Sequence, residues 1–159
     1  MEVLVLGIIT FVLLKLGLNN TFSVDEQIYL VDYSLIRPAR ALLAEDGKEY
    51  LVILILRMFV KIFGFSIANA RLASILFGSL ALVSLCLIGK KLKISTLVSL
   101  MIMFSSSYFI YYSRSILFEI YLLFYVFSLF YGLLIFDTNR RLALIILALS
   151  SFGGNFTKA

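Results

Sequence analysis

The residues of this chain best suited to chemistry are the adjacent carboxylates Asp25 and Glu26, which come seven residues after the first hydrophobic segment ends. A carboxylate can act as a general base that takes a proton from a hydroxyl or an amine, with a neighbour that orients it. The same residues also fit the start of a helix, with Ser23 or Asp25 as the N-cap and Glu26 in the first turn. Both interpretations stay open, and they are compatible with each other.

Further charged residues lie where hydrophobic segments begin or end. Arg114 falls in a short turn, and Glu119 lies about one helical turn into the next hydrophobic segment, where ionisable groups are costly and usually mark a function or a partner. In one interpretation Arg114 binds a phosphate and Glu119 lines the same cavity. In the other, the two side chains pair locally and Glu119 complements a helix N-terminus. Arg71 and Lys158 could each bind a phosphate, or extend toward the lipid headgroups as interfacial residues do.

The composition indicates a membrane protein. Hydrophobic residues make up 62% of the 159 residues and the mean hydropathy is +1.07, against about 45–50% apolar residues in soluble domains. Histidine is absent and Cys86 is the single cysteine, which argues against a Ser-His-Asp triad, an intrachain disulfide and a cysteine zinc site. We therefore expect no metal and no cofactor. The net charge of +5 does not point to nucleic acid, because most of the excess lies in two short clusters between hydrophobic runs.

Five hydrophobic segments are long enough, or nearly so, for a membrane-spanning helix of about 20 residues. They are residues 3–18, 70–89, 94–112, 116–136 and 142–157. The first is interpreted as an anchor that stays in the protein, because no basic region precedes it and no small-residue cleavage site follows it. The predicted fold is therefore all-α: a single transmembrane module over residues 1–159, with about five spans.

Two surface helices are expected in the loop formed by residues 19–69. They are Asp25–Ala44 and Tyr50–Phe63. The second would be about 21 Å long at 1.5 Å per residue, and it carries Arg57 and Lys61 four residues apart. A cation at the centre of a spanning helix costs roughly 2.5–3.5 kcal/mol, whereas a helix that lies flat in the interface avoids this cost.

The basic clusters predict the orientation. If Tyr50–Phe63 lies flat, the clusters at 90–93 and 140–141 fall on the side of the N-terminus, and the positive-inside rule makes that side cytoplasmic. If this segment spans, both clusters lie outside. We predict the first arrangement, a multi-pass protein of the plasma membrane with loop 19–69, the turn at 113–115 and the C-terminal end on the extracytoplasmic face.

The order of the charged residues and hydrophobic segments along the chain is similar to that of a known protein family. One apolar span is followed by Asp25-Glu26, two surface helices, Phe63-Gly64-Phe65-Ser66, and Arg71-Leu72-Ala73-Ser74 at the start of the second span. This order resembles the N-terminal part of GT-C glycosyltransferases of the protein O-mannosyltransferase and lipid A aminoarabinose transferase type. Ser113-Arg114 with Glu119 is similar to a second acidic position of that family, and Thr157-Lys158-Ala159 resembles its Thr-Lys-Gly segment.

The resemblance implies an inverting sugar transfer from a polyprenyl- or dolichyl-phosphate donor to a protein or lipid acceptor. By resemblance, Asp25 would be the base that activates the acceptor, and Glu26 and Glu119 would line the site. Arg114 and Lys158 would meet the donor phosphate, whose developing negative charge cations stabilise directly.

The chain also departs from the family. Its residues Glu45–Tyr50 contain neither the His nor the Pro that members usually carry before the second surface helix. Members have many more spans, so the chain is expected to be the N-terminal part of a longer enzyme. Two alternatives remain: a non-enzymatic membrane subunit or small transporter, in which Arg114 and Glu119 form a structural pair, and a carrier of polyprenyl phosphate that binds without transferring sugar.

Overall fold

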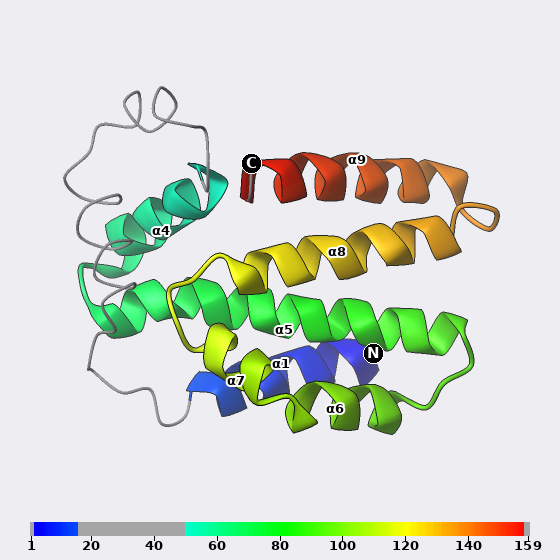
Figure 1. Cartoon of the computed structure of the whole chain (residues 1–159), viewed down its shortest axis with the longest axis horizontal. Coiled ribbons are helices and arrows are strands. Elements are labelled where there is room, and N and C mark those ends of the chain that lie inside the picture. The colour runs from blue at the N-terminus through cyan, green and yellow to red at the C-terminus, as the bar shows by residue number, and fades with distance from the viewer. Residues whose placement is uncertain (1, 16–49, 158–159) are drawn as a thin grey trace.

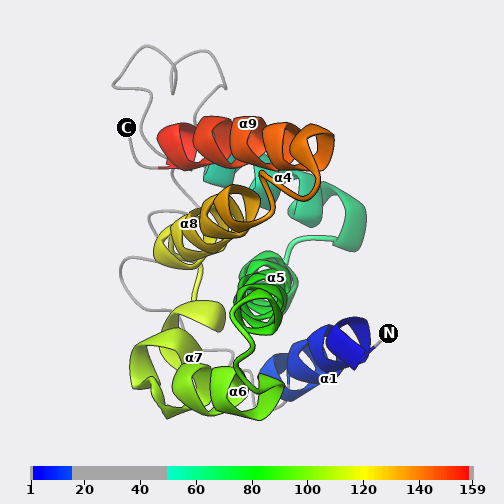
Figure 2. The ribbon, with the colours of Figure 1, turned by 90° about the vertical axis from the view of Figure 1, so that its right-hand side faces the viewer.

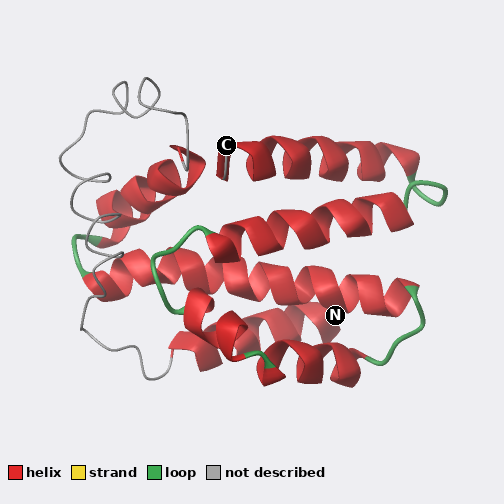
Figure 3. Cartoon of the chain, in the orientation of Figure 1, coloured by secondary structure: helices red, strands yellow, loops and turns green. Residues whose placement is uncertain are grey.

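The computed structural model describes residues 2–15 and 50–157, and the secondary structure of this part is helical throughout. The helices are α1 (Glu2–Lys15), α4 (Tyr50–Phe63), α5 (Ile67–Lys91), α6 (Thr96–Ser105), α7 (Ser107–Ser113), α8 (Glu119–Leu134) and α9 (Arg140–Thr157) (Figures 1 and 3). The all-α prediction is confirmed for these residues. The predicted helix Asp25–Ala44 lies outside them.

Helix α5 is the centre of the bundle. Seen along the bundle, it lies between α1 and α8, with α9 beyond α8 and the short helices α6 and α7 beside α1 (Figure 2). Two hydroxyl contacts, Ser74 to Tyr121 and Ser84 to Ser128, show that α5 and α8 run in the same direction. The segment between two parallel helices must therefore return along the bundle, and α6 and α7 make this return.

The remaining helices alternate in direction. Gly7 of α1 packs on Val83, while the Leu14 carbonyl near the end of α1 meets Arg114 at the other end of the bundle. Helix α9 returns along α8, with Gly153 against Tyr125 and Gly132 against Leu147. Helices α1, α5, α6–α7, α8 and α9 thus traverse the bundle five times in alternating directions (Figure 1).

One of the described helices, α5, is by itself long and apolar enough to cross a membrane. The predicted span 94–112 is not one straight helix, because α6 and α7 meet at a bend of 80°, and the pair adds a second candidate only if it forms one broken span. The predicted span 116–136 begins as a helix at Glu119, and α1 and α8 are shorter apolar helices. Five spans are therefore not established by helix length and composition.

Helix α4 has the bounds expected from the sequence. Its residues Val52, Ile53 and Leu56 are buried, whereas Lys61 is exposed. The helix ends in a tight turn, where Gly64 has a φ of +84° that favours glycine. Asn69 closes this turn, because its side-chain amide donates to the carbonyl oxygens of Phe63 at 2.7 Å and Gly64 at 3.1 Å.

Small residues line the contacts of α5 with the short helices α6 and α7. A methyl group on Gly78 would lie 2.6 Å from the Ser113 hydroxyl oxygen, and one on Gly89 would lie 2.6 Å from that of Ser99. Small side chains let helix backbones approach closely, and the buried Ser113 hydroxyl at the Gly78 contact has no hydrogen-bond partner in the described part of the chain. Close approach at small residues is expected of helices in a membrane, where apolar side chains gain little by leaving lipid.

Candidate functional site

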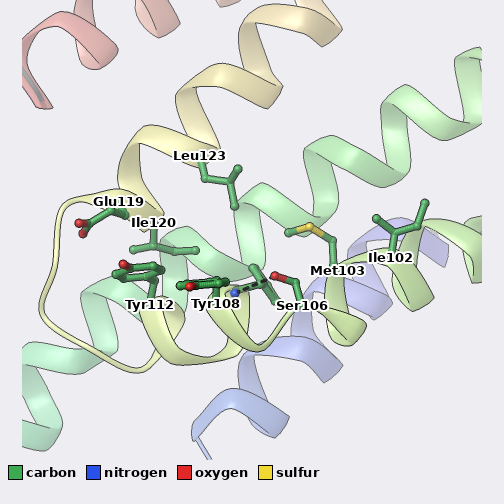
Figure 4. Close-up of a pocket in the computed structure, with 9 residues that line it drawn as sticks. Ile102, Met103, Ser106, Tyr108, Tyr112, Glu119, Ile120 and Leu123 are labelled. Atoms are coloured by element: carbon green, nitrogen blue, oxygen red, sulfur yellow. Dashed lines mark hydrogen bonds between the residues drawn. The ribbon is translucent and has the colours of Figure 1, made fainter.

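A pocket of about 380 Å³ opens where α6, α7 and α8 meet. Its lining is mostly apolar and aromatic, with one carboxylate and three hydroxyl groups: Ile102, Met103, Ser106, Tyr108, Phe109, Tyr112, Glu119, Ile120 and Leu123. Figure 4 shows Glu119 and Tyr112 at one end and Ile102 at the other. The pocket therefore has a polar, aromatic end and an aliphatic end.

The bend at Ser106 shapes the pocket. Ser106 ends α6 and caps α7, because its side-chain oxygen accepts a hydrogen bond of 3.3 Å from the Phe109 amide. The 80° change of direction turns α7 beneath the start of α8 (Figure 4). In α7 the rings of Tyr108 and Tyr112 are nearly parallel, with an interplanar angle of 17° and centroids 6.1 Å apart.

Glu119 is the first residue of α8 and the only carboxylate of the pocket lining. Its side chain lies beside the Tyr112 ring (Figure 4). The Oε2 atom is enclosed and has no hydrogen-bond partner in the described part of the chain. Buried polar atoms are nearly always hydrogen-bonded, so an enclosed acceptor without a donor needs an explanation.

Arg114 does not form the predicted local pair with Glu119. Its Nε donates a hydrogen bond of 3.1 Å to the Leu14 carbonyl, across 100 residues of sequence. The last carbonyls of a helix have no partner within the helix, so a cation there satisfies an acceptor and complements the dipole. Arg114 thus ties the end of α1 to the turn before α8.

The other predicted site residues are distributed as follows. Arg71 lies near the start of α5, is only 6% exposed and has an interaction partner. Asp25, Glu26 and Lys158 lie outside the described residues. Thr157, the neighbour of Lys158, is buried and donates its hydroxyl to the Gly153 carbonyl at 2.7 Å.

The described residues Arg71, Arg114, Glu119 and Thr157 lie toward one end of the bundle. Helices α1 and α9 finish there, and α5 and α8 start there (Figure 1). In the sequence, loop 19–69 follows α1 and leads into the start of α5. The basic clusters lie at the opposite end, where the Lys91 ammonium donates to the Thr138 hydroxyl at 3.1 Å.

The sequence interpretation missed part of the pocket. Tyr108 and Tyr112 lie in an aromatic run that fits an interfacial belt, and Ser106 and Met103 gave no functional signal by themselves. The run Ser105-Ser106-Ser107 interrupts the hydrophobic segment 94–112, and it is the one local sign of the bend.

No protein-family model, no curated protein and no solved structure matches this chain.

Proposed function

We propose that this chain is the N-terminal membrane module of an inverting glycosyltransferase that takes its sugar from a polyprenyl- or dolichyl-phosphate donor. The acceptor is a protein or a lipid, and the reaction takes place on the extracytoplasmic face. The observation that carries the proposal is the pocket beside Glu119, at the end of the bundle from which the loop with Asp25-Glu26 leaves. In this proposal the five traverses of the bundle are the five membrane spans.

The lining of the pocket supports this assignment. A lipid-linked sugar has a long apolar tail and a polar head, and the pocket has an aliphatic end with Ile102 and a polar end with Glu119 and the tyrosines. Aromatic rings pack on the apolar faces of sugars, and carboxylates accept hydrogen bonds from polar head groups. Arg114 lies in the turn between α7 and α8, five residues before Glu119.

The proposed reaction is a single displacement at the anomeric carbon. Asp25 takes the proton from the acceptor hydroxyl or amine as that atom attacks the sugar. The bond from the sugar to the phosphate breaks, a bond to the acceptor forms with inversion, and the polyprenyl phosphate leaves with the electron pair. Arg114, Lys158 and Arg71 are the proposed cations that stabilise the charge of this leaving group, and Glu26 and Glu119 line the site.

Asp25→Asn tests the base in the complete enzyme. The amide keeps the shape of the side chain but cannot take the proton, so we expect transfer from a radiolabelled polyprenyl-phosphate sugar to fall by at least about 100-fold, the lower end of general-base effects. Asp46→Asn in the same loop is the matched control and should retain activity. Wild-type turnover by Asp25→Asn, at wild-type expression, would refute the assignment.

One observation favours the non-enzymatic alternative. Arg114 holds the end of α1 through the Leu14 carbonyl, which is a structural role that a membrane subunit also needs. A guanidinium has further N–H donors besides Nε, so this contact is compatible with phosphate binding. If Arg114→Lys retains expression and assembly but loses affinity for polyprenyl phosphate, the phosphate role stands; equal affinity favours the structural subunit.

A further inference from the structure

The end of the bundle opposite the pocket, where α5 finishes and α9 starts, is strongly basic (Figure 1). Its two turns, residues 90–95 and 135–141, carry five exposed basic side chains and one exposed carboxylate: Lys90, Lys91, Lys93, Arg140, Arg141 and Asp137. We propose that this surface, the basic end, binds the headgroup of an anionic phospholipid. The inference goes beyond the proposed sugar transfer, which takes place at the other end, and requires only that the bundle lies in a bilayer.

The fold brings the two basic turns into contact. The Lys91 ammonium donates to the Thr138 hydroxyl at 3.1 Å, across 47 residues of sequence. A topology signal needs only basic residues near the ends of the spans, with no contact between the turns that carry them. Like charges on neighbouring turns repel each other, so an anion that meets both turns stabilises this arrangement.

Lys93 occupies a backbone position that favours glycine. It follows the end of α5 with a φ of +61°, in the left-handed region. Its amide donates to the Lys90 carbonyl at 3.2 Å, and the Ile94 amide donates to the Gly89 carbonyl at 2.7 Å. These two bonds form the Schellman motif, whose left-handed position is usually glycine because a side chain is strained there. Such strain is retained where the side chain is used, which points to a role for the Lys93 cation.

The arginines at the start of α9 are not explained by helix stability. Arg140 and Arg141 are the first two residues of this helix, and its first turn contains no acidic residue. Cations are unfavourable at the positive end of the helix dipole, whereas an anion there is favourable. A phosphate group at the basic end therefore compensates both arginines as well as the lysines of the neighbouring turn.

Apolar side chains beside the cations favour a lipid as the source of this phosphate. Leu92 and Ile94, on either side of Lys93, are 52% and 44% exposed, and Leu142, next to Arg141, is 43% exposed. A soluble anion would leave these side chains in water, whereas a phospholipid places its acyl chains directly beside its phosphate. Basic residues at the ends of membrane helices bind anionic headgroups in this way.

Phosphatidylglycerol and phosphatidylcholine with the same acyl chains are a matched pair of probes, because both contain a phosphate but only the first has a net negative charge. Native mass spectrometry of the chain in detergent, with each lipid titrated, gives the dissociation constant of the first bound lipid. We expect the wild type to bind phosphatidylglycerol about tenfold more tightly than phosphatidylcholine. Lys93→Gln should weaken phosphatidylglycerol binding about fivefold, the effect of one basic residue at a membrane surface.

Lys61→Gln is the matched control, because Lys61 is an exposed lysine on α4, toward the pocket end. It should keep the wild-type preference. Lys93→Gly separates binding from folding, since glycine relieves the left-handed strain. This variant should unfold at a higher temperature than the wild type and still bind phosphatidylglycerol as weakly as Lys93→Gln does.

Equal affinity of the wild type for the two lipids, or equal weakening by Lys93→Gln and Lys61→Gln, would overturn the inference and leave the basic turns as topology signals alone. Tighter binding of a short oligonucleotide than of phosphatidylglycerol would overturn it as well, because the surface would then be assigned to nucleic acid. None of these measurements involves sugar transfer, so a failure of the proposed reaction is separate from a failure of this site.

Discussion

At the scale of single residues, glycines decide how closely the helices approach. Gly153 of α9 faces the ring of Tyr125, and a Cβ on it would lie 2.2 Å from the Cε1 atom of that ring. Tyr125 cannot easily give way, because its ring is packed against Phe124 at 5.1 Å and Phe77 at 6.1 Å between centroids. The adjacent Gly154 has its nearest such neighbour at 3.8 Å, which is ordinary contact.

Gly153→Ala should therefore destabilise the protein by about 1–3 kcal/mol, the usual cost of inserting a methyl group into a packed interior. Thermal unfolding in detergent, followed by the helical circular dichroism signal, measures the change. Gly154→Ala is the matched control and should unfold at nearly the wild-type temperature. The same loss of stability in both variants would contradict the role of the Tyr125 contact, because replacing glycine by alanine within a helix is by itself stabilising.

At the scale of the helices, α5 and α8 are joined by hydroxyl groups. The Oγ atoms of Ser84 and Ser128 lie 3.2 Å apart, and both side chains are buried. Nearer the start of both helices, the hydroxyl oxygens of Ser74 and Tyr121 lie 3.3 Å apart in the same interface. These contacts fix the register of two parallel helices whose other side chains are mostly interchangeable aliphatic and aromatic groups.

A double-mutant cycle of Ser84→Ala and Ser128→Ala should give a coupling of about 0.6 kcal/mol, typical of hydrogen bonds between helices in membranes. The free energies of unfolding would be measured by titration with denaturing detergent. Ser79→Ala replaces Ser84→Ala in the control cycle, because the Ser79 hydroxyl donates to the Ile75 carbonyl of its own helix. That cycle should be additive, and an equal coupling in both cycles would contradict the proposed cross-helix bond.

The bend between α6 and α7 links the helices to the pocket. A straight helix over residues 94–112 would not turn the Tyr108 and Tyr112 rings beneath the start of α8. Because α5 and α8 are parallel, the segment between them has to travel the length of the bundle, and the bend lies on this path. The bend between α6 and α7 thus has two consequences. It lies on the path by which the chain returns from α5 to α8, and it places residues of α7 in the lining of the pocket.

At the scale of the whole molecule, the two ends of the bundle differ in chemistry. One end holds the pocket, Arg114 and the α4–α5 turn, and the other holds Lys90, Lys91 and the turn before Arg140. The contact from Lys91 to Thr138 joins the two basic turns. These two basic turns are the clusters from which the sequence predicted the cytoplasmic side, while Lys61, Arg71 and Arg114 lie toward the pocket end.

Single cysteines at Phe65 and Asn139, in a Cys86→Ala background, test this arrangement. Both positions are exposed. Phe65 lies in the turn between α4 and α5 and Asn139 in the turn between α8 and α9, and these two turns lie at opposite ends of the bundle (Figure 1). On intact cells, a membrane-impermeant thiol reagent should label the cysteine at 65 and should label the one at 139 only after permeabilisation. Labelling of both on intact cells, or of neither, would contradict a membrane-crossing bundle with the pocket outside.

Much of this protein follows from its sequence alone. Hydrophobic runs of helical length predicted the all-α class, and the charges of Arg57 and Lys61 predicted a separate helix, Tyr50–Phe63, with the bounds that the structure gives it. Such features depend on local composition, because a helix satisfies its own backbone and buries its apolar side chains in any apolar surroundings. Glu119 was likewise predicted as a candidate site residue by its charge within a hydrophobic run, and it lines the pocket.

The tertiary structure determined which contacts the charged residues and the hydrophobic segments make. The sequence allowed a local pair of Arg114 and Glu119, but Arg114 contacts Leu14, 100 residues earlier in the chain. It also allowed one straight span over residues 94–112, but that segment is bent by 80°. Contacts of this kind depend on the parallel arrangement of α5 and α8 and on the small residues that let them approach, and neither is encoded by hydropathy. The charge of a residue is therefore a property of the sequence, whereas its partner is a property of the fold.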